Sequence, residues 1–210
     1  MNVDKTPISI LVVDDHPMLR EGLATMIGSV SDFSLVAEAG TGMEALAQFE
    51  KHRPDVTLMD LRLPDINGIE VIEQIRRRHP EAKIIVLTTY LGDVQALRAL
   101  RAGALGYLLK ATLRLDLVDT IHAVYSGKRR LHAEVVAELA AHAMDDTLTQ
   151  RETDVLNQIA AGCSNKVVAD RLQISEDTVK GHVRNILSKL NANDRTHAVT
   201  IALRRGFLDL

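Results

Sequence analysis

Short apolar runs alternate with amphipathic stretches through the first 128 residues of the chain. The runs have the length and β-branched content that are typical of buried parallel strands. They cover residues 8–13, 34–39, 56–60, 83–88 and 106–109. Between them, apolar residues recur at the spacing of one helical face. The alternation predicts an α/β fold, in which helices cover both faces of a parallel sheet and right-handed crossovers join its strands.

The pattern changes after residue 128. Residues 129–147 begin basic, become rich in alanine and glutamate and end on two acids, which favours a partly helical linker. Residues 148–210 contain the start and stop signals of short helices. Thr149 and Glu152, at the beginning of this segment, have the spacing of a capping box. We therefore predict two domains, residues 1–128 and 148–210, of which the second is small, all α-helical and built from four helices.

Polar residues stand where four of the predicted strands end. Asp14 and Asp15 follow the first run, Asp60 ends the third, Thr88 ends the fourth and Lys110 follows the fifth. Open α/β sheets bind ligands beyond the carboxyl ends of their strands. If the first and third strands are neighbours, three carboxylates converge there and need a cation. Carboxylate and carbonyl oxygens suit Mg2+ better than Zn2+, so we expect a magnesium site.

Asp60 is the candidate nucleophile of this site. A carboxylate beside a hard cation, with a hydroxyl and an ammonium group within reach, is suited to accept a phosphoryl group by in-line attack. Taken singly, Asp14 and Asp15 are equally compatible with helix N-terminal acids ahead of Pro17. The combination of all the polar strand ends favours a phosphoacceptor site.

The first domain resembles the receiver domain of two-component response regulators. The resemblance lies in the segments VVDDHP, LMDLRLPDINGIE, IIVLTTY and GALGYLLKA and covers about residues 7–127. It implies a flavodoxin-like fold with five parallel strands in the order 2-1-3-4-5. It also implies a sensor histidine kinase as the partner that supplies the phosphoryl group. Receivers often carry proline after the lysine, where this chain has Ala111.

The resemblance assigns a role to each site residue. Asp60 is implied to be the phosphoacceptor and, with Asp15, a direct magnesium ligand, while Asp14 acts chiefly through water. The remaining implied roles are those of the Arg62 backbone carbonyl as a further ligand, Thr88 and Lys110 as partners of the phosphoryl group, and Tyr107 as a residue that turns inward when Thr88 moves. For Tyr107, a plain core position is the alternative.

Three neighbouring side chains carry weaker expectations. Arg62 and Tyr90 lie two residues beyond Asp60 and Thr88, where their bulk is expected to slow hydrolysis of the phosphoryl group. His16 adjoins the site, but we expect a helix cap or a solvated side chain there rather than a ligand.

Residues 164–190 read as two short helices around a tight turn. Ser164 and Ser175 can cap them. The second helix has an apolar stripe on one side and Lys180, Gly181 and Arg184 on the other, so two cations one turn apart face outward. Taken alone, such charges are usually a solvated face; here the capped helix pair around them favours a DNA contact.

This second domain resembles the LuxR-type helix-turn-helix of the NarL/FixJ response regulators, from LTQRETDVL through DRTHAVTIALRRGFL. The resemblance implies that Lys180, Gly181 and Arg184 face base edges of double-stranded DNA. Relatives often have a larger side chain at the Gly181 position. Phosphate contacts are expected from five further residues: Asn165, Lys166, Thr178, Asn185 and Lys189. In the family, a helix such as that expected at about 195–205 pairs two subunits on DNA, so we predict a homodimer.

The composition of the chain limits where the protein is expected in the cell and what it is expected to bind. Cys163 is the one cysteine of the chain, which excludes an intramolecular disulfide and favours a reducing interior. The N-terminal residues lack a signal-peptide pattern, and no apolar run approaches the roughly 18 residues that span a bilayer. We therefore expect a soluble cytoplasmic protein with no membrane contact. Residues 148–210 carry 9 Lys and Arg against 7 Asp and Glu, a net charge of +2 in a chain whose total is −3.

These expectations combine into a DNA-binding response regulator, in which magnesium-dependent phosphorylation of Asp60 controls dimerisation, promoter binding and thereby transcription. Contact with RNA polymerase is left open. The protein is expected to be no enzyme beyond its own phosphorylation and dephosphorylation. One alternative is a constitutive DNA binder with a non-signalling receiver. Another is a phosphatase or phosphotransferase with an aspartyl intermediate, against which stands the lack of an acid two residues after Asp60, where the chain has Arg62.

Overall fold

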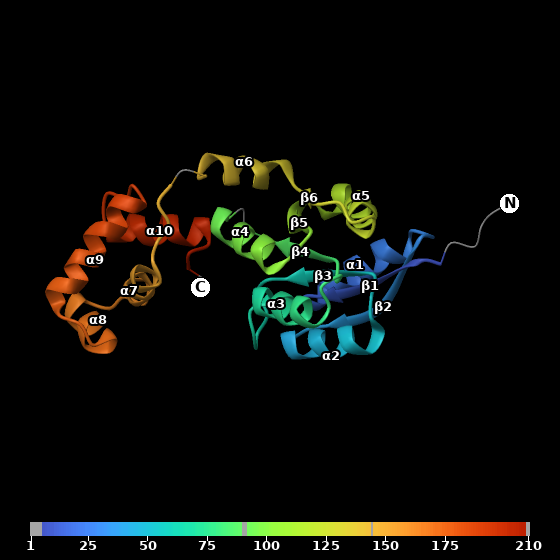
Figure 1. Cartoon of the computed structure of the whole chain (residues 1–210), viewed down its shortest axis with the longest axis horizontal. Coiled ribbons are helices and arrows are strands. Elements are labelled where there is room, and N and C mark those ends of the chain that lie inside the picture. Colours follow the sequence, from blue (N-terminus) through green and yellow to red (C-terminus); the bar gives the residue numbers. More distant parts are fainter. Residues whose placement is uncertain (1–5, 90–91, 144, 209–210) are drawn as a thin grey trace. The chain divides into compact units, whose positions relative to one another are not determined.

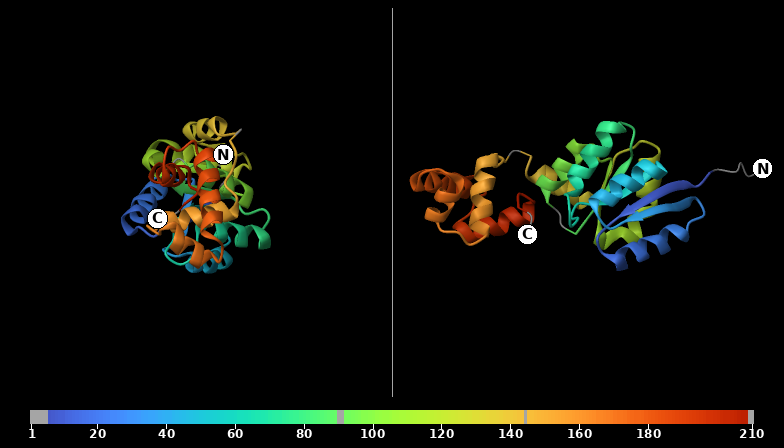
Figure 2. Two further views of the ribbon diagram at one scale, coloured as in Figure 1. Left: turned by 90° about the vertical axis from the view of Figure 1, so that its left-hand side faces the viewer. Right: turned by 90° about the horizontal axis from the view of Figure 1, so that it is seen from below.

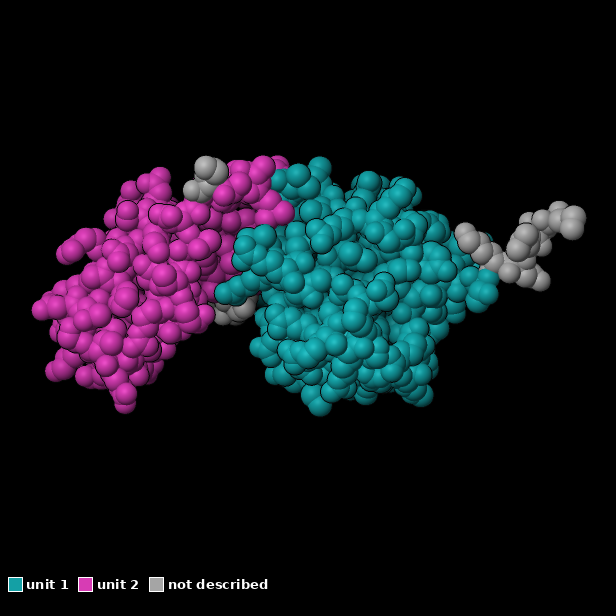
Figure 3. Space-filling model, viewed as in Figure 1, with its two compact units in different colours: residues 1–90, 96–136 teal, residues 91–95, 137–210 magenta. Residues whose placement is uncertain are grey.

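The structure, a computed structural model, describes residues 6–89, 92–143 and 145–208. The chain divides into two compact units, residues 1–90 with 96–136 and residues 91–95 with 137–210, which Figure 3 colours separately. The elements follow one another in the order β1 (Ile8–Val13), α1 (Pro17–Gly28), β2 (Phe33–Ala39), α2 (Gly42–His52), β3 (Val56–Asp60), α3 (Gly68–Arg78), β4 (Ile84–Thr88), α4 (Asp93–Ala102), β5 (Gly106–Leu109), the 3-10 turn η1 (Lys110–Thr112), α5 (Leu113–Tyr125), β6 (Arg130–Leu131), α6 (Ala133–Ala141), α7 (Gln150–Ala160), α8 (Asn165–Leu172), α9 (Glu176–Lys189) and α10 (Arg195–Arg205).

The first unit is built on a parallel sheet with the strand order β2-β1-β3-β4-β5-β6 (Figure 1). The five predicted strands are confirmed, each within one residue of its expected bounds. Their order is also the expected one, and β1 lies between β2 and β3. The point where the order reverses is therefore beside β1, which puts the carboxyl ends of β1 and β3 at the ligand-binding edge.

A sixth strand corrects the expectation of five. It is formed by β6 at the start of the predicted linker, which pairs in parallel with the free edge of β5. The amide of Arg130 donates to the carbonyl of Leu105, and the amide of His132 donates to that of Tyr107. An unpaired strand edge leaves backbone donors and acceptors without partners, and this short segment satisfies some of those of β5. Two residues are too few to give a periodic signal in the sequence.

Helices cover both faces of the sheet, as predicted. Because side chains alternate along a strand, each strand sends residues to two separate cores. One core joins the sheet to α1 and α5; α2 and α3 lie on the opposite face (Figure 2, right). Its fully buried members include Ile10, Leu23, Leu58, Leu108 and Ile121.

The second unit contains α7 to α10 around a core of its own, so the prediction of four helices in this domain is confirmed. The predicted capping box is present, with the Thr149 side chain accepting from the Glu152 amide and the Glu152 carboxylate accepting from the Thr149 amide. Such reciprocal bonds satisfy donors that the first turn of a helix cannot pair internally. Gly206 ends α10 with a left-handed φ of 79°, a conformation that favours glycine.

Candidate functional site

The acidic residues come together at the carboxyl ends of β1 and β3. Val13 pairs with Met59, so the residues that follow them, Asp14 and Asp60, lie side by side. Asp14, Asp15, His16 and Asp60 each offer a ligand atom, and these atoms lie within 4.8 Å of one another. The predicted convergence of three carboxylates is thus present in the structure.

Lys110 lies between two of these carboxylates. Its Nζ is 2.7 Å from Oδ2 of Asp14 and 2.6 Å from Oδ2 of Asp60, and the three side chains are 13%, 0% and 5% exposed, respectively. Burial raises the pKa of Asp60, and the hydrogen bond from Lys110 opposes that rise. Burial also disfavours the Lys110 ammonium, but its bonds to Asp14 and Asp60 leave its pKa raised. The charges of the site therefore depend on one another.

Thr88 and Tyr107 lie on the two strands next to this cluster. Val86 pairs with Tyr107 and Thr88 with Leu109, so both residues belong to neighbouring strands β4 and β5. The Tyr107 side chain is fully buried. Burial raises the pKa of Tyr107 to about 12. The phenol is therefore neutral at physiological pH, on the strand next to the one that carries Thr88.

Two further side chains at the site were not assigned to it from the sequence. His16 stands at the N-cap of α1 but makes no capping hydrogen bond with its side chain; its Nδ1 lies 2.6 Å from Asp15 and 3.2 Å from Asp14. Arg20 donates from its guanidinium to the Asp14 carbonyl at 2.6 Å. Arg20 lies one turn into the helix that follows the two acids. This position is a sequence signal for contact with the site, but many solvent-exposed arginines occupy a similar position.

The loop after Asp60 contacts the Asp60 side chain through its backbone. The Arg62 amide donates to Oδ1 of Asp60 at 3.2 Å, which brings the loop to the predicted phosphoacceptor. The three carboxylates of the cluster supply oxygen ligands of the kind that Mg2+ prefers, so the residues present fit this ion. Tyr90, the second residue expected to influence hydrolysis, lies outside the described residues.

In the second unit, α8 and α9 form the predicted pair of capped helices. The Ser164 hydroxyl accepts from the Val167 amide and the Ser175 hydroxyl from the Thr178 amide, so both predicted caps are confirmed. Val179 and Ile186 of α9 are buried in the helical core. The opposite side of α9 is exposed to solvent, as the apolar stripe predicted.

Two family models match the chain. The response regulator receiver domain matches residues 10–122, and the luxR family of bacterial regulatory proteins matches residues 146–202. The chain is 38% identical to YxjL of Bacillus subtilis, an uncharacterised transcriptional regulatory protein, over 99% of this chain and 100% of that protein. It is 37% identical to the response regulator VraR of Staphylococcus saprophyticus, over 96% and 99% of the two chains.

Solved structures agree with the sequence relatives. The response regulator ChrA of a heme-sensing two-component system is 34% identical, with a TM-score of 0.58 and coverage of 96% of this chain and 99% of that one. The RcsB–DNA complex matches with a TM-score of 0.71 at 23% identity, over 95% and 99% of the chains, which shows a common fold. This chain is a response regulator with a LuxR-type DNA-binding domain.

The response regulator carries its predicted base-reading residues on α9. Lys180 and Arg184 are exposed, and Gly181 between them has open space where a Cβ would stand. Lys180 is ion-paired with Asp177 at 3.0 Å and with Glu176 at 3.8 Å. Hydrogen bonding to Asp177 raises the Lys180 pKa. Its cation is therefore engaged within its own helix.

The five residues expected at phosphates have different surroundings. Asn165 and Lys166 begin α8, and Asn185 is exposed on α9. The Thr178 hydroxyl is 2.7 Å from that of Ser175, within the cap of α9. All of these contacts are within the chain, so the DNA roles of the five residues stay predictions.

Lys189, the fifth, is tied to its own unit. Its Nζ lies 2.8 Å from Oε2 of Glu152 and donates to the carbonyl of Thr147 at 3.1 Å. Burial would raise the pKa of Glu152, but hydrogen bonds from Lys189 and Thr149 lower it. Lys189 thus connects α9 to the segment before α7.

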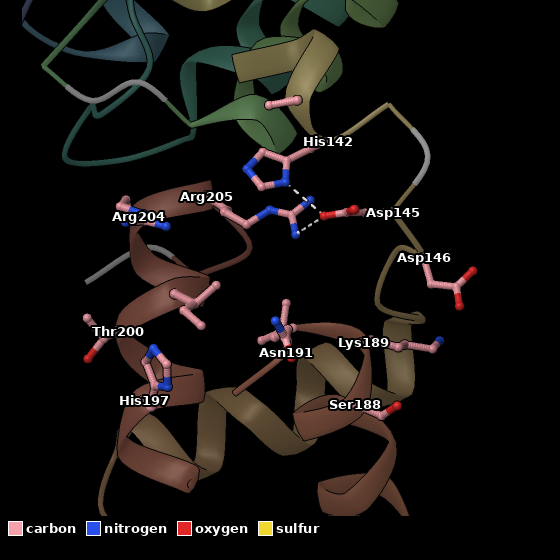
Figure 4. A pocket seen from close by; sticks show the side chains of 13 residues that line it. His142, Asp145, Asp146, Ser188, Lys189, Asn191, His197, Thr200, Arg204 and Arg205 are labelled. Carbon is pink, nitrogen blue, oxygen red and sulfur yellow. Dashed lines mark hydrogen bonds and ion pairs between the residues drawn. The ribbon is translucent and has the colours of Figure 1, made fainter. Parts of the chain in front are cut away.

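Lys189 also lines a polar pocket, where Figure 4 shows the side chains of His142 and Arg205 directed at the carboxylate of Asp145. Asp145 is 2.8 Å from His142 Nδ1 and 2.9 Å from an Arg205 nitrogen. Lys189 and Arg205 of this pocket are thus each paired with acids of the same unit. In the part of the chain that the structure describes, no helix is long and apolar enough to cross a bilayer.

Proposed function

We propose that Asp60 accepts a phosphoryl group from a sensor histidine kinase and that this modification controls promoter binding. The observation that carries the proposal is the placement of Asp60. Its carboxylate is nearly buried at the end of β3, in contact with the Lys110 ammonium and beside Asp14 and Asp15. A carboxylate held in this way is suited to nucleophilic attack on phosphorus.

In the transfer, an Asp60 carboxylate oxygen forms a bond to phosphorus while the bond between phosphorus and the donor histidine nitrogen breaks. The product is an acyl phosphate on Asp60, and the electron pair of the broken bond stays with the imidazole. Lys110, already 2.6 Å from Asp60, is placed to neutralise charge on the phosphoryl oxygens. The Arg62 amide, 3.2 Å from the same carboxylate, holds one of its oxygens.

Asp14, Asp15, Asp60 and the Arg62 carbonyl would hold Mg2+. When bound, the ion supplies charge neutralisation and a fixed orientation for the incoming phosphoryl group. Arg20 holds the backbone of Asp14 in place from α1. The three carboxylates, whose ligand atoms converge within 4.8 Å, support this part of the proposal.

Thr88 and Tyr107 are proposed to carry the response away from Asp60. A phosphoryl group on Asp60 offers new acceptor oxygens to the Thr88 hydroxyl, and Tyr107, on the neighbouring strand β5, is proposed to respond when Thr88 moves. Phosphorylation then biases an equilibrium that already exists between two states. The inward, buried Tyr107 belongs to one of these states.

The output is proposed to be a cytoplasmic homodimer on double-stranded DNA, with α9 in the major groove. A solved structure holds two RcsB dimers on two parallel DNAs, and RcsB shares the fold of this chain. Two-fold pairing supplies affinity that a single module lacks. We further propose that the protein turns over no substrate other than its own phosphoryl group. Contact with RNA polymerase would follow from a role in activation.

The proposal is tested with the purified full chain, acetyl phosphate and Mg2+. We expect an adduct of one phosphoryl group per chain that alkali and hydroxylamine cleave, as for an acyl phosphate, absent in Asp60→Asn, and tighter binding of promoter DNA by the phosphorylated form. If the wild-type chain forms no adduct, the phosphoacceptor role is wrong. If the adduct forms but Asp60→Asn binds promoter DNA as the phosphorylated chain does, the protein is a constitutive DNA binder. Turnover of small phosphate esters beyond one equivalent would instead indicate a phosphatase.

A further inference from the structure

The loop between β3 and α3 is hydrogen-bonded to the N-terminus of α2, a helix that it does not adjoin in the sequence. Oδ1 of Asp65 accepts from the Gly42 amide at 2.7 Å, and Oδ2 accepts from the Met43 amide at 2.9 Å. Both amides belong to the first turn of α2, whose donors have no partner within the helix. The two oxygens of one carboxylate thus join the loop after Asp60 to the N-terminus of α2.

Packing at the same point is close. A Cβ on Gly42 would stand within 2.9 Å of the Ile66 side chain, so the loop lies directly on the backbone at the start of α2. Only a residue without a side chain leaves room for this approach. Asp65 and Ile66 therefore seat the tip of the loop through a polar and an apolar contact side by side.

The base of the loop is closed by Gly68. Its amide donates to the Leu61 carbonyl at 2.9 Å, and a Cβ there would collide with the backbone of Asp60 and Leu61. The Asn67 side chain caps α3 by accepting from the Ile69 amide at 2.8 Å. Between this closed base and the seated tip lies Arg62, whose amide contacts Asp60. Arg62 thus sits on a segment that is fixed at both ends.

We propose that Asp65 is a positioning residue for the phosphorylation site. It holds the loop against α2 and so keeps the Arg62 backbone beside Asp60. The inference rests on the proposed function, because the Arg62 carbonyl matters only if the site holds a cation. Asp65 is exposed and lies outside the acidic cluster, so it acts through the loop and not as a ligand.

Electrostatics agrees with this geometry. The hydrogen bonds from Met43 and Gly42 hold the pKa of Asp65 below its usual range, so the carboxylate is charged where the partial positive charge of the α2 N-terminus favours an anion. Asparagine at this position keeps one acceptor oxygen and loses the charge, and alanine loses both.

Thr41 provides a matched control. Its hydroxyl accepts from the Glu44 amide at 3.1 Å and caps the same helix end, but from the residue next to the helix. Thr41→Ala and Asp65→Ala therefore both remove an acceptor from the first turn of α2. Only Asp65→Ala releases the loop. A role confined to the stability of α2 would make the two variants alike.

The experiment measures Mg2+ affinity of the full chain by calorimetry, together with thermal unfolding in EDTA. Groups that orient metal ligands typically change affinity by 10- to 100-fold, so we expect Asp65→Ala to weaken Mg2+ binding about tenfold and Asp65→Asn to weaken it less. Thr41→Ala should lower the unfolding temperature by a few degrees and leave Mg2+ affinity within about twofold of wild type.

The outcomes separate the two proposals. If the wild-type chain binds Mg2+ and Asp65→Ala binds it equally well, or if Thr41→Ala weakens binding as much as Asp65→Ala, the positioning role is wrong and the proposed function stands. If the wild-type chain binds no Mg2+, the magnesium-dependent function fails and this inference fails with it.

Discussion

The charges at the end of the sheet and those on α9 differ in how far the fold fixes them. The Asp14 and Asp60 side chains are 0% and 5% exposed and share one ammonium group. On α9, Asp177 and Lys180 are 91% and 53% exposed and pair within a single helix. A buried charge must have a partner in the folded state, whereas an exposed one is stabilised by water with or without a partner. The acidic site is therefore held in place by the fold itself, and the exposed cations of α9 are free to exchange partners.

The largest effect is expected from removing the shared partner in the buried site. Lys110→Ala leaves Asp14 and Asp60 facing each other without their ammonium group, so we expect the free energy of unfolding in EDTA at pH 7 to fall by about 3 kcal/mol. The measurement is chemical denaturation of the full chain. Lys180→Ala, which removes an exposed partner of acids, is the matched control and should leave the unfolding midpoint unchanged.

The effect of Lys110→Ala depends on pH with a definite sign. Without Lys110, the folded-state pKa of Asp60 rises further above its unfolded value, so the penalty exists only where the carboxyl must ionise. The difference from wild type should therefore be full at pH 7 and shrink as the pH falls toward 3.8, the ordinary value for the carboxyl. A difference that stays constant over this range would show that Lys110 stabilises by packing alone.

For DNA binding we expect the exposed cations of α9 to have the larger effect, since they gain partners only when DNA is bound. Arg184→Ala should weaken binding to cognate DNA by about ten- to a hundredfold, and binding to random DNA much less, if its guanidinium reads a base. Lys180→Ala should cost less, because wild-type Lys180 must first leave Asp177 and Glu176. Fluorescence anisotropy on both DNAs at fixed salt measures these ratios. Equal losses on cognate and random DNA would reassign both residues to phosphate contacts.

The sequence predicted the parts of the molecule that rest on local patterns. Strands, caps and the convergence of Asp14, Asp15 and Asp60 follow from hydrophobic period, capping residues and the parallel topology. What it did not predict rests on long-range pairing of few residues. The two-residue strand β6 has no period of its own, and Asp65 reaches α2 across 23 positions of sequence. Neither carries a local signal that distinguishes it from a solvated loop.

Lys189 is an intermediate case between the buried and the exposed charges. Its side chain is 24% exposed and that of its partner Glu152 is 4% exposed. Lys189→Ala should lower the free energy of unfolding of the second unit by about 1–2 kcal/mol at pH 7. Because the folded-state pKa of Glu152 is lowered, this contribution is present above the unfolded value of 4.5 and is lost as the pH falls through the folded one.

The salt dependence of DNA binding decides whether Lys189 also contacts phosphate. Each phosphate contact contributes about 0.9 to the slope of log affinity against log salt concentration. If Lys189 serves only Glu152 and Thr147, the slope of Lys189→Ala should equal that of wild type. A slope reduced by about 0.9 would confirm the predicted phosphate contact, and an unchanged unfolding curve would contradict the structural role.

The smallest effect is expected at Gly181, where helix stability and close approach to DNA favour different residues. Glycine inside a helix costs about 1 kcal/mol relative to alanine, and a Cβ at this position meets no atom within 4 Å. Gly181→Ala should therefore stabilise the second unit by up to about 1 kcal/mol in denaturation experiments. If the α9 backbone approaches a base pair here, the same methyl group must reduce affinity for cognate DNA, measured beside Arg184→Ala. Stabilisation with unchanged affinity would mean that α9 keeps its backbone away from the bases at this position, and that specificity rests on the long side chains on either side of it.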